Sequence, residues 1–181
     1  MSERPTTDPK LVVIDLFDDG WRALDARLDG LTDDEYLWEP VREMWTVRPA
    51  RNGAGGVADG AGEHMESDSG SVTTIAWRLW HLANDCFDNY SARVQGRVGP
   101  SETDAGWHLD AATGHSELAA ATARFRTLVA ARTPEEWWEP LGSNWGPFRH
   151  HSLFDLVQHA SHELLHHGAE IALLRDLHAA Q

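Results

Sequence analysis

The chain has 181 residues and a mass of 20.2 kDa, and 41% of its residues are hydrophobic, which is enough for one sizeable core. We therefore expect one domain over residues 1–181. The balance of 15 Lys and Arg against 29 Asp and Glu gives a formal net charge of -14, which repels nucleic-acid phosphates and anionic lipid surfaces. No stretch approaches the roughly 18 consecutive apolar residues of a membrane span. We expect neither nucleic acid nor a membrane as a partner.

The single cysteine, Cys86, cannot form an internal disulfide, and the first ten residues lack the apolar stretch of a secretory signal. Both features predict a cytoplasmic protein. Because Cys86 is flanked by Ala83, Phe87 and Tyr90, we interpret it as a small buried apolar residue.

Helical spacing of apolar residues predicts a first helix from about Asp8 to Leu31. Thr32 and Glu35 then form a capping-box pattern, T-x-x-E, so a short helix is expected to begin there and end before Pro40. The segment 48–71 is rich in Gly, Ala, Asp and Ser and has no apolar period, which predicts a long surface loop.

Residues 73–94 are strongly apolar and lack Pro and Gly, as expected of a helix buried on more than one side, and His81 lies in its middle. A turn region over 96–106 leads to an Ala-rich helix over 109–132. A second capping box follows at Thr133 and Glu136, with Pro134 at the first helical position. The last helix is expected over 152–177.

A weak internal repeat accompanies this order: residues 32–40 resemble 133–140, and Trp45 and Trp145 lie five residues beyond the prolines that end the two copies. Two similar corners and a duplicated helical hairpin explain this repeat equally well. Either way, the pattern predicts an all-α four-helix bundle, with a long loop between the first and second long helices. No strand-like alternation of any length competes.

Seven of the eleven histidines lie in the last quarter of the chain, and helix geometry separates them. At about 100° per residue, the apolar side of the last helix covers roughly a third of its circumference. His167 falls inside this apolar stripe and Glu163 at its edge, one turn earlier. His162 lies almost opposite, and His166 points well away.

A buried, unpaired carboxylate costs several kcal/mol, so Glu163 needs a cation, a partner or water. Residues four apart on a helix converge on one point, and His81 from the other buried helix would complete a three-residue divalent-metal site with open positions. Asp85, one turn from His81, is suited to orient its ring. A metal-free pairing of Glu163 with His167 is weighed about equally on these grounds.

Two other patterns are weaker. His162 and His166 match the zincin pattern H-E-x-x-H, but on this helix both imidazoles would face solvent. Trp77, one turn before His81, could line a substrate pocket, although packing is the commoner role of such tryptophans. Leu165 and Leu173 point away from the apolar stripe, which hints at a homodimer contact.

These residues resemble a known family, the DinB/YfiT-like metalloenzymes, which include bacterial thiol S-transferases and the metal-binding domain of mycothiol-dependent maleylpyruvate isomerase. The resemblance rests on Trp80-His81-Leu82-Ala83 and on Glu163-Leu-Leu-His166-His167-Gly-Ala-Glu-Ile171, which is similar to the family's H-x-x-H-H-R-G-Q-[IL]. It implies a metal triad of one His from the second helix and an H-x-x-x-H pair from the fourth. By position these are His81, Glu163 and His167.

The chain departs from the family pattern at two places. Glu163 stands where the first His of the pair is usual, and Gly-Ala replaces the usual Arg-Gly after the second. A His-carboxylate-His set suits Zn²⁺, and also Fe²⁺, Ni²⁺ or Mn²⁺. A register shifted by one residue would select His162 and His166 instead.

The resemblance implies a divalent-metal-dependent enzyme that activates a low-molecular-weight thiol for transfer to a small electrophilic substrate. The stretches LTDDEYLWEPV, TIAWRLWHLA and HHGAEIALLRDL are similar to an actinobacterial branch of the family, which makes mycothiol the expected thiol by analogy. The alternatives are a metal-assisted hydrolase, a metal- or small-molecule-binding protein without catalysis, whose coordination sphere would be closed, and a metal-free helical protein.

Overall fold

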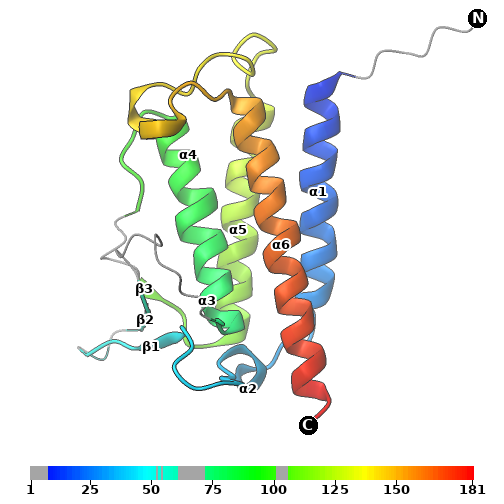
Figure 1. The fold of residues 1–181 in the computed structure, drawn as a ribbon, viewed down its shortest axis with the longest axis vertical. Helices are drawn as coiled ribbons and strands as arrows, with labels where there is room; N and C mark the ends of the chain where they lie inside the picture. The colour runs from blue at the N-terminus through cyan, green and yellow to red at the C-terminus, as the bar shows by residue number, and fades with distance from the viewer. Residues whose placement is uncertain (1–7, 52, 54, 61–71, 101–105) are drawn as a thin grey trace, which may run out of the picture.

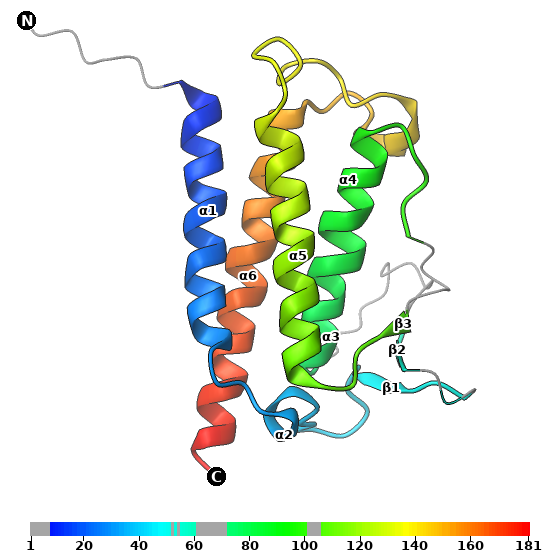
Figure 2. The ribbon, with the colours of Figure 1, turned by 180° about the vertical axis from the view of Figure 1, so that it is seen from behind.

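The computed structural model describes residues 8–51, 53, 55–60, 72–100 and 106–181. They are mostly helical, with a small three-stranded sheet. The long helical segments run side by side: α1 (Pro9–Leu28), the continuous stretch α3 (Ile75–Trp80), η1 (His81–Asp88) and α4 (Asn89–Val94), then α5 (Ala111–Ala130) and α6 (Leu153–Ala179) (Figures 1 and 2). Within the described part, no helix is both long and apolar enough to cross a bilayer.

Each long helical segment begins at a side-chain cap that the sequence contains. Asp8, Thr74, Asp110 and Ser152 each accept a hydrogen bond from a backbone N–H of the first turn, which satisfies a donor that the helix leaves free. Ser152 forms a full capping box with Asp155. The helices predicted over 8–31, 73–94, 109–132 and 152–177 are therefore found within a few residues of their expected ends.

The predicted surface loop over 48–71 is partly wrong. Two short strands, β1 (Val47–Pro49) and β2 (Gly56–Ala58), pair antiparallel there, and β3 (Gly106–Trp107) pairs with β2. Strands of two or three residues are too short to produce a readable alternation, which explains why the sequence pattern missed them. Residues 52, 54 and 61–71 of the predicted loop lie outside the described residues.

The two predicted capping boxes have different outcomes. Thr32 and Glu35 cap the short helix α2 (Asp33–Tyr36) as expected. Thr133 and Glu136 make the same reciprocal hydrogen bonds, but residues 134–138 form turns and no helix follows. A short 3-10 element, η3 (Ser143–Phe148), occupies part of the connection to α6 instead. Capping chemistry therefore marks both corners, yet only the first corner continues as a helix.

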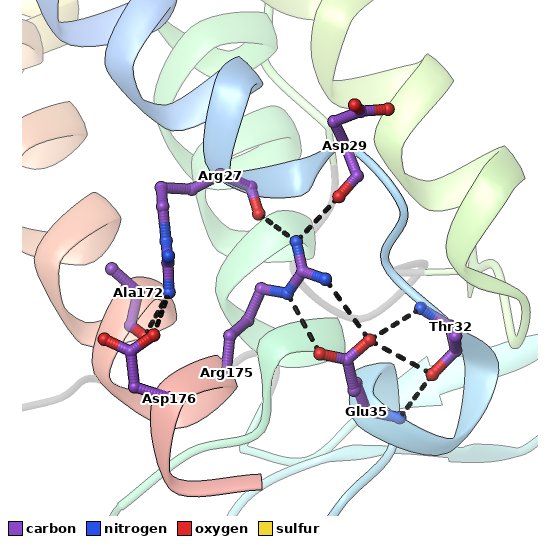
Figure 3. A network of polar contacts seen from close by, with 7 residues as sticks. All are labelled: Arg27, Asp29, Thr32, Glu35, Ala172, Arg175 and Asp176. Carbon is purple, nitrogen blue, oxygen red and sulfur yellow. Dashed lines mark hydrogen bonds and ion pairs between the residues drawn. The ribbon is translucent and has the colours of Figure 1, made fainter. Parts of the chain in front are cut away.

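A polar network fastens the C-terminal part of α6 to the corner between α1 and α2 (Figure 3). The Arg175 guanidinium donates to both carboxylate oxygens of Glu35 and to the backbone carbonyls of Arg27 and Asp29. Glu35 in turn accepts from the backbone N–H and the hydroxyl of Thr32. One carboxylate thus completes a helix cap and an interhelical ion pair at once.

The core lies between the long helices, where Phe17 of α1, Phe87 of η1 and Phe125 of α5 pack with ring centroids 5.5–5.7 Å apart. The apolar stripe predicted for α6 is buried, whereas Leu165 and Leu173 are exposed. Their exposure agrees with the wheel, and the homodimer inferred from it stays a prediction.

Candidate metal centre

The structure brings His81, Glu163 and His167 together in the interior. His81 is the first residue of η1, and Glu163 and His167 lie one turn apart on α6. The Glu163 Oε2 atom is 2.9 Å from His167 Nε2 and 3.5 Å from His81 Nε2. The two imidazole rings meet edge to face, with centroids 5.0 Å apart. One carboxylate oxygen therefore sits between the Nε2 atoms of two rings from different helices.

The Nδ1 atom of each imidazole contacts a carboxylate other than Glu163. His81 Nδ1 lies 3.2 Å from Asp85 Oδ2, and His167 Nδ1 lies 2.7 Å from Glu170 Oε2. Glu170 is itself anchored by Arg78 Nε at 2.8 Å. A hydrogen bond at Nδ1 fixes the ring orientation and leaves Nε2 free as a donor to a metal. Asp85 thus occupies the orienting position that the sequence predicted.

The centre concentrates opposite charges in a region of low exposure. Burial alone would raise the pKa of Glu163, but hydrogen bonds with His167 and His81 outweigh it and hold that pKa well below its usual range. Burial lowers the pKa of His81, while Cys86, Asp85 and Glu163 together raise it well above its usual value. The site therefore favours an ionised carboxylate and attracts positive charge.

The two donor distances measured from Glu163 are compatible with a divalent cation. Among the described residues, the ligand groups whose donor atoms all lie within 4.8 Å of one another are His81 with Cys86 and Glu163, and His166 with His167 and Glu170. Donor atoms around a tetrahedral ion with bonds of about 2.0–2.1 Å lie roughly 3.3 Å apart, and the two distances from Glu163 Oε2, 2.9 and 3.5 Å, lie on either side of that value. The nitrogen and oxygen donors suit Zn²⁺ and neighbouring transition metals. The contacts with His167 and His81 already compensate the buried carboxylate, so they are equally consistent with the metal-free pairing considered from the sequence.

Cys86 is the residue whose position the sequence analysis missed. It is buried, as expected, but its Sγ atom lies 3.7 Å from His81 Nε2, and His81, Cys86 and Glu163 form a candidate metal-ligand group with donor atoms within 4.8 Å of one another. On an α-helix, residue 86 would lie about 140° from residue 81. Because 81–88 is a π-helix, with hydrogen bonds between residues five apart, Cys86 comes close to His81 instead.

The alternative register, shifted by one residue, selects two histidines that lie outside the centre. His162 and His166 are both exposed, as the helical wheel predicts. His166 lies 3.2 Å from Glu170 Oε1, and His166, His167 and Glu170 form a second group of potential ligands at the surface side of the centre. The sequence analysis also passed over His159, whose Nε2 is 3.4 Å from the other oxygen of Glu163.

Trp77 acts as one wall of the centre. Its ring is stacked on the His81 imidazole, at a centroid distance of 5.3 Å and an interplanar angle of 11°, and its indole N–H donates to the Asp59 carbonyl at 2.8 Å. Trp77 is buried, which agrees with the packing role that the sequence analysis considered for it. The same contact restricts rotation of the His81 ring.

Comparison with known proteins identifies the family of the chain. The family model described as the DinB superfamily matches residues 16–171, a range that includes His81, Glu163 and His167. Searches of curated proteins and of solved structures found no match. Since the family match covers most of the sequence, the chain belongs to the DinB superfamily.

Proposed function

We propose that this protein is a divalent-metal-dependent enzyme that activates a low-molecular-weight thiol, with mycothiol the first to test, for transfer to a small electrophilic molecule. His81, Glu163 and His167 hold the ion, with Zn²⁺ the first candidate, on a DinB-like four-helix bundle. One observation carries the proposal: a single Glu163 oxygen lies within 3.5 Å of two Nε2 atoms whose rings are each oriented by a carboxylate.

When bound, such an ion lowers the pKa of a thiol or water and polarises a carbonyl or epoxide oxygen. The chain contributes the arrangement around it. Hydrogen bonds from the two Nδ1 atoms to Asp85 and Glu170 would favour the tautomer whose Nε2 can bind the ion, and Trp77 covers one face of His81. In the transfer step the thiol proton passes to solvent, the sulfur forms a bond to the electrophilic carbon, and the bond from that carbon to the leaving group breaks with its electron pair staying on the leaving group, which is chloride for the electrophile tested below.

A second function is favoured by Cys86. If its sulfur binds the ion together with His81, Glu163 and His167, four protein donors close the coordination sphere, which is typical of structural zinc. The protein would then bind metal without catalysis. X-ray absorption of the zinc form separates the two functions: a sulfur shell at about 2.3 Å that is lost in Cys86→Ser supports the closed site, and nitrogen and oxygen alone at about 2.0–2.2 Å support the open one.

The activity test uses tag-free, zinc-loaded protein with mycothiol, bacillithiol or glutathione and 1-chloro-2,4-dinitrobenzene as electrophile. We expect thiol-dependent product formation above the uncatalysed rate with at least one thiol. Glu163→Gln should reduce the rate by at least 100-fold, roughly as expected for the loss of a metal ligand. The control His150→Ala, an exposed histidine outside both the centre and the neighbouring pocket, should change the rate less than about threefold. Absence of turnover with all three thiols in fully loaded protein would reject thiol transfer to this type of electrophile.

A further inference from the structure

A pocket of about 380 Å³ lies beside the candidate centre, between α4, the 3-10 element η3 and the N-terminal half of α6. His159 belongs to both places: it lines the pocket, and its Nε2 is 3.4 Å from Glu163 Oε1. Tyr90, which also lines the pocket, packs against His159 with ring centroids 6.0 Å apart. The inner wall of the pocket is therefore one side chain away from the proposed ligand Glu163.

The walls of this pocket are aromatic. Trp145 is buried and lies 6.1 Å from Tyr90 by ring centroids, at an interplanar angle of 42°. Phe148, which is 57% exposed, stands edge-on to His151 on the outer side. Aromatic walls favour a flat apolar ligand, since ring stacking adds to the burial of apolar area.

The same pocket contains an arginine, Arg93, although the protein as a whole is acidic. The Arg93 guanidinium lies 5.6 Å from the centroid of Trp145, and it forms no ion pair with any carboxylate of the described residues. Arginines elsewhere, such as Arg78, Arg124 and Arg126, are each paired with Asp or Glu.

The one carboxylate in the lining, Asp155, accepts hydrogen bonds from the backbone N–H and hydroxyl of Ser152 at the start of α6. His151 and His162 add further nitrogen donors to the lining. An anion that enters the pocket thus finds Arg93 available, whereas a cation would find the only carboxylate already engaged.

Two residues of α4 orient the ligand. Arg93 follows Tyr90 by three residues, so both side chains project from the same side of the helix, and both line the pocket. A ligand whose anionic group pairs with Arg93 would therefore place the opposite side of its ring beside Tyr90 and His159, next to Glu163.

We propose that this pocket binds the electrophilic substrate of the enzyme, and that the substrate class is a small aromatic carboxylate. Its carboxylate pairs with Arg93, its ring packs against the aromatic wall that Trp145 and Tyr90 form, and its reactive carbon faces the Glu163 side. The assignment of this ligand as substrate rests on the proposed function, but its binding does not require the metal.

The test is calorimetric titration with 2-naphthoate and with its neutral isostere 2-naphthamide, in chelator-treated and in zinc-loaded protein. We expect wild type to bind naphthoate at least tenfold more tightly than naphthamide. Arg93→Gln should remove this preference, and the control Arg97→Gln, an exposed arginine outside the pocket, should keep it. Phe148→Ala, at an exposed position that does not threaten folding, should weaken both ligands severalfold.

Equal affinity for the two ligands in wild type, no naphthoate binding at millimolar concentration, or an unchanged preference in Arg93→Gln would each overturn the proposal. The titration is repeated without metal, so naphthoate should still bind if the proposed metal site is wrong. Zinc should still bind if the proposed pocket is wrong. The two proposals can therefore be rejected separately.

Discussion

Zinc is expected to raise the melting temperature of the tag-free protein by about 10 °C when its free concentration is a thousandfold above the dissociation constant. Binding to the folded state alone then contributes about 4 kcal/mol. For a chain of this length, each kcal/mol shifts the melting temperature by about 2–4 °C. Scanning calorimetry of chelator-treated protein, with and without added zinc, measures the shift directly.

Two variants locate the origin of this shift. Glu163→Gln keeps the side-chain volume but removes the charge, and should abolish most of the zinc-induced increase. Asp85→Asn leaves the ligands in place but weakens the orientation of His81, and should reduce zinc affinity by about 10–100-fold. Only the zinc-induced difference is compared, because either change also alters the metal-free protein. An equal shift in wild type and Glu163→Gln would place zinc elsewhere.

Replacement of Glu35 by alanine is expected to lower the free energy of unfolding by about 3 kcal/mol. The change removes the capping box with Thr32 and leaves the guanidinium of Arg175 without its carboxylate. The side chains of Glu35 and Arg175 are only 12% and 18% exposed, so solvent screens the pair weakly. Urea denaturation at neutral pH measures the loss.

The pH dependence provides a second check. Burial raises the pKa of Glu35, but hydrogen bonds from Arg175 and Thr32 outweigh it, so that the folded-state pKa is lowered. A lowered pKa contributes stability above the unfolded value of about 4.3, and this contribution is lost as the pH falls through the folded value. The difference between wild type and Glu35→Ala should therefore shrink below about pH 4.

A matched control exists on α1. Arg22 and Asp19 form an ion pair at 2.6 Å, but their side chains are 74% and 68% exposed. Asp19→Ala should cost less than about 0.5 kcal/mol. If Glu35→Ala cost no more than this control, the network in Figure 3 would contribute nothing beyond a surface ion pair.

Much of this arrangement could be predicted from the sequence because the relevant signals are local. Cap residues such as Thr32 and Ser152 mark helix starts within three or four positions. On α6, a single wheel placed Glu163 and His167 inward and His162 outward, because that helix is regular over its whole length. The contact with His81 followed from the need to compensate a buried carboxylate.

The remainder depends on features that a periodic pattern does not contain. Cys86 approaches His81 because 81–88 is a π-helix, and an α-helical wheel points it away. The pocket combines Arg93 of α4 with Trp145 of η3, which are brought together only by tertiary packing. The sheet joins residues near 47, 57 and 106, and no alternation in any of them indicates a strand.

The central claim, a metal held by His81, Glu163 and His167, is tested most directly by the metal content of tag-free protein, measured by elemental mass spectrometry in wild type, Glu163→Ala and His162→Ala. The proposed site predicts near-stoichiometric metal in wild type and in His162→Ala, and loss of nearly all of it in Glu163→Ala. Metal lost only in His162→Ala, or absent from wild type purified without chelator, would contradict it.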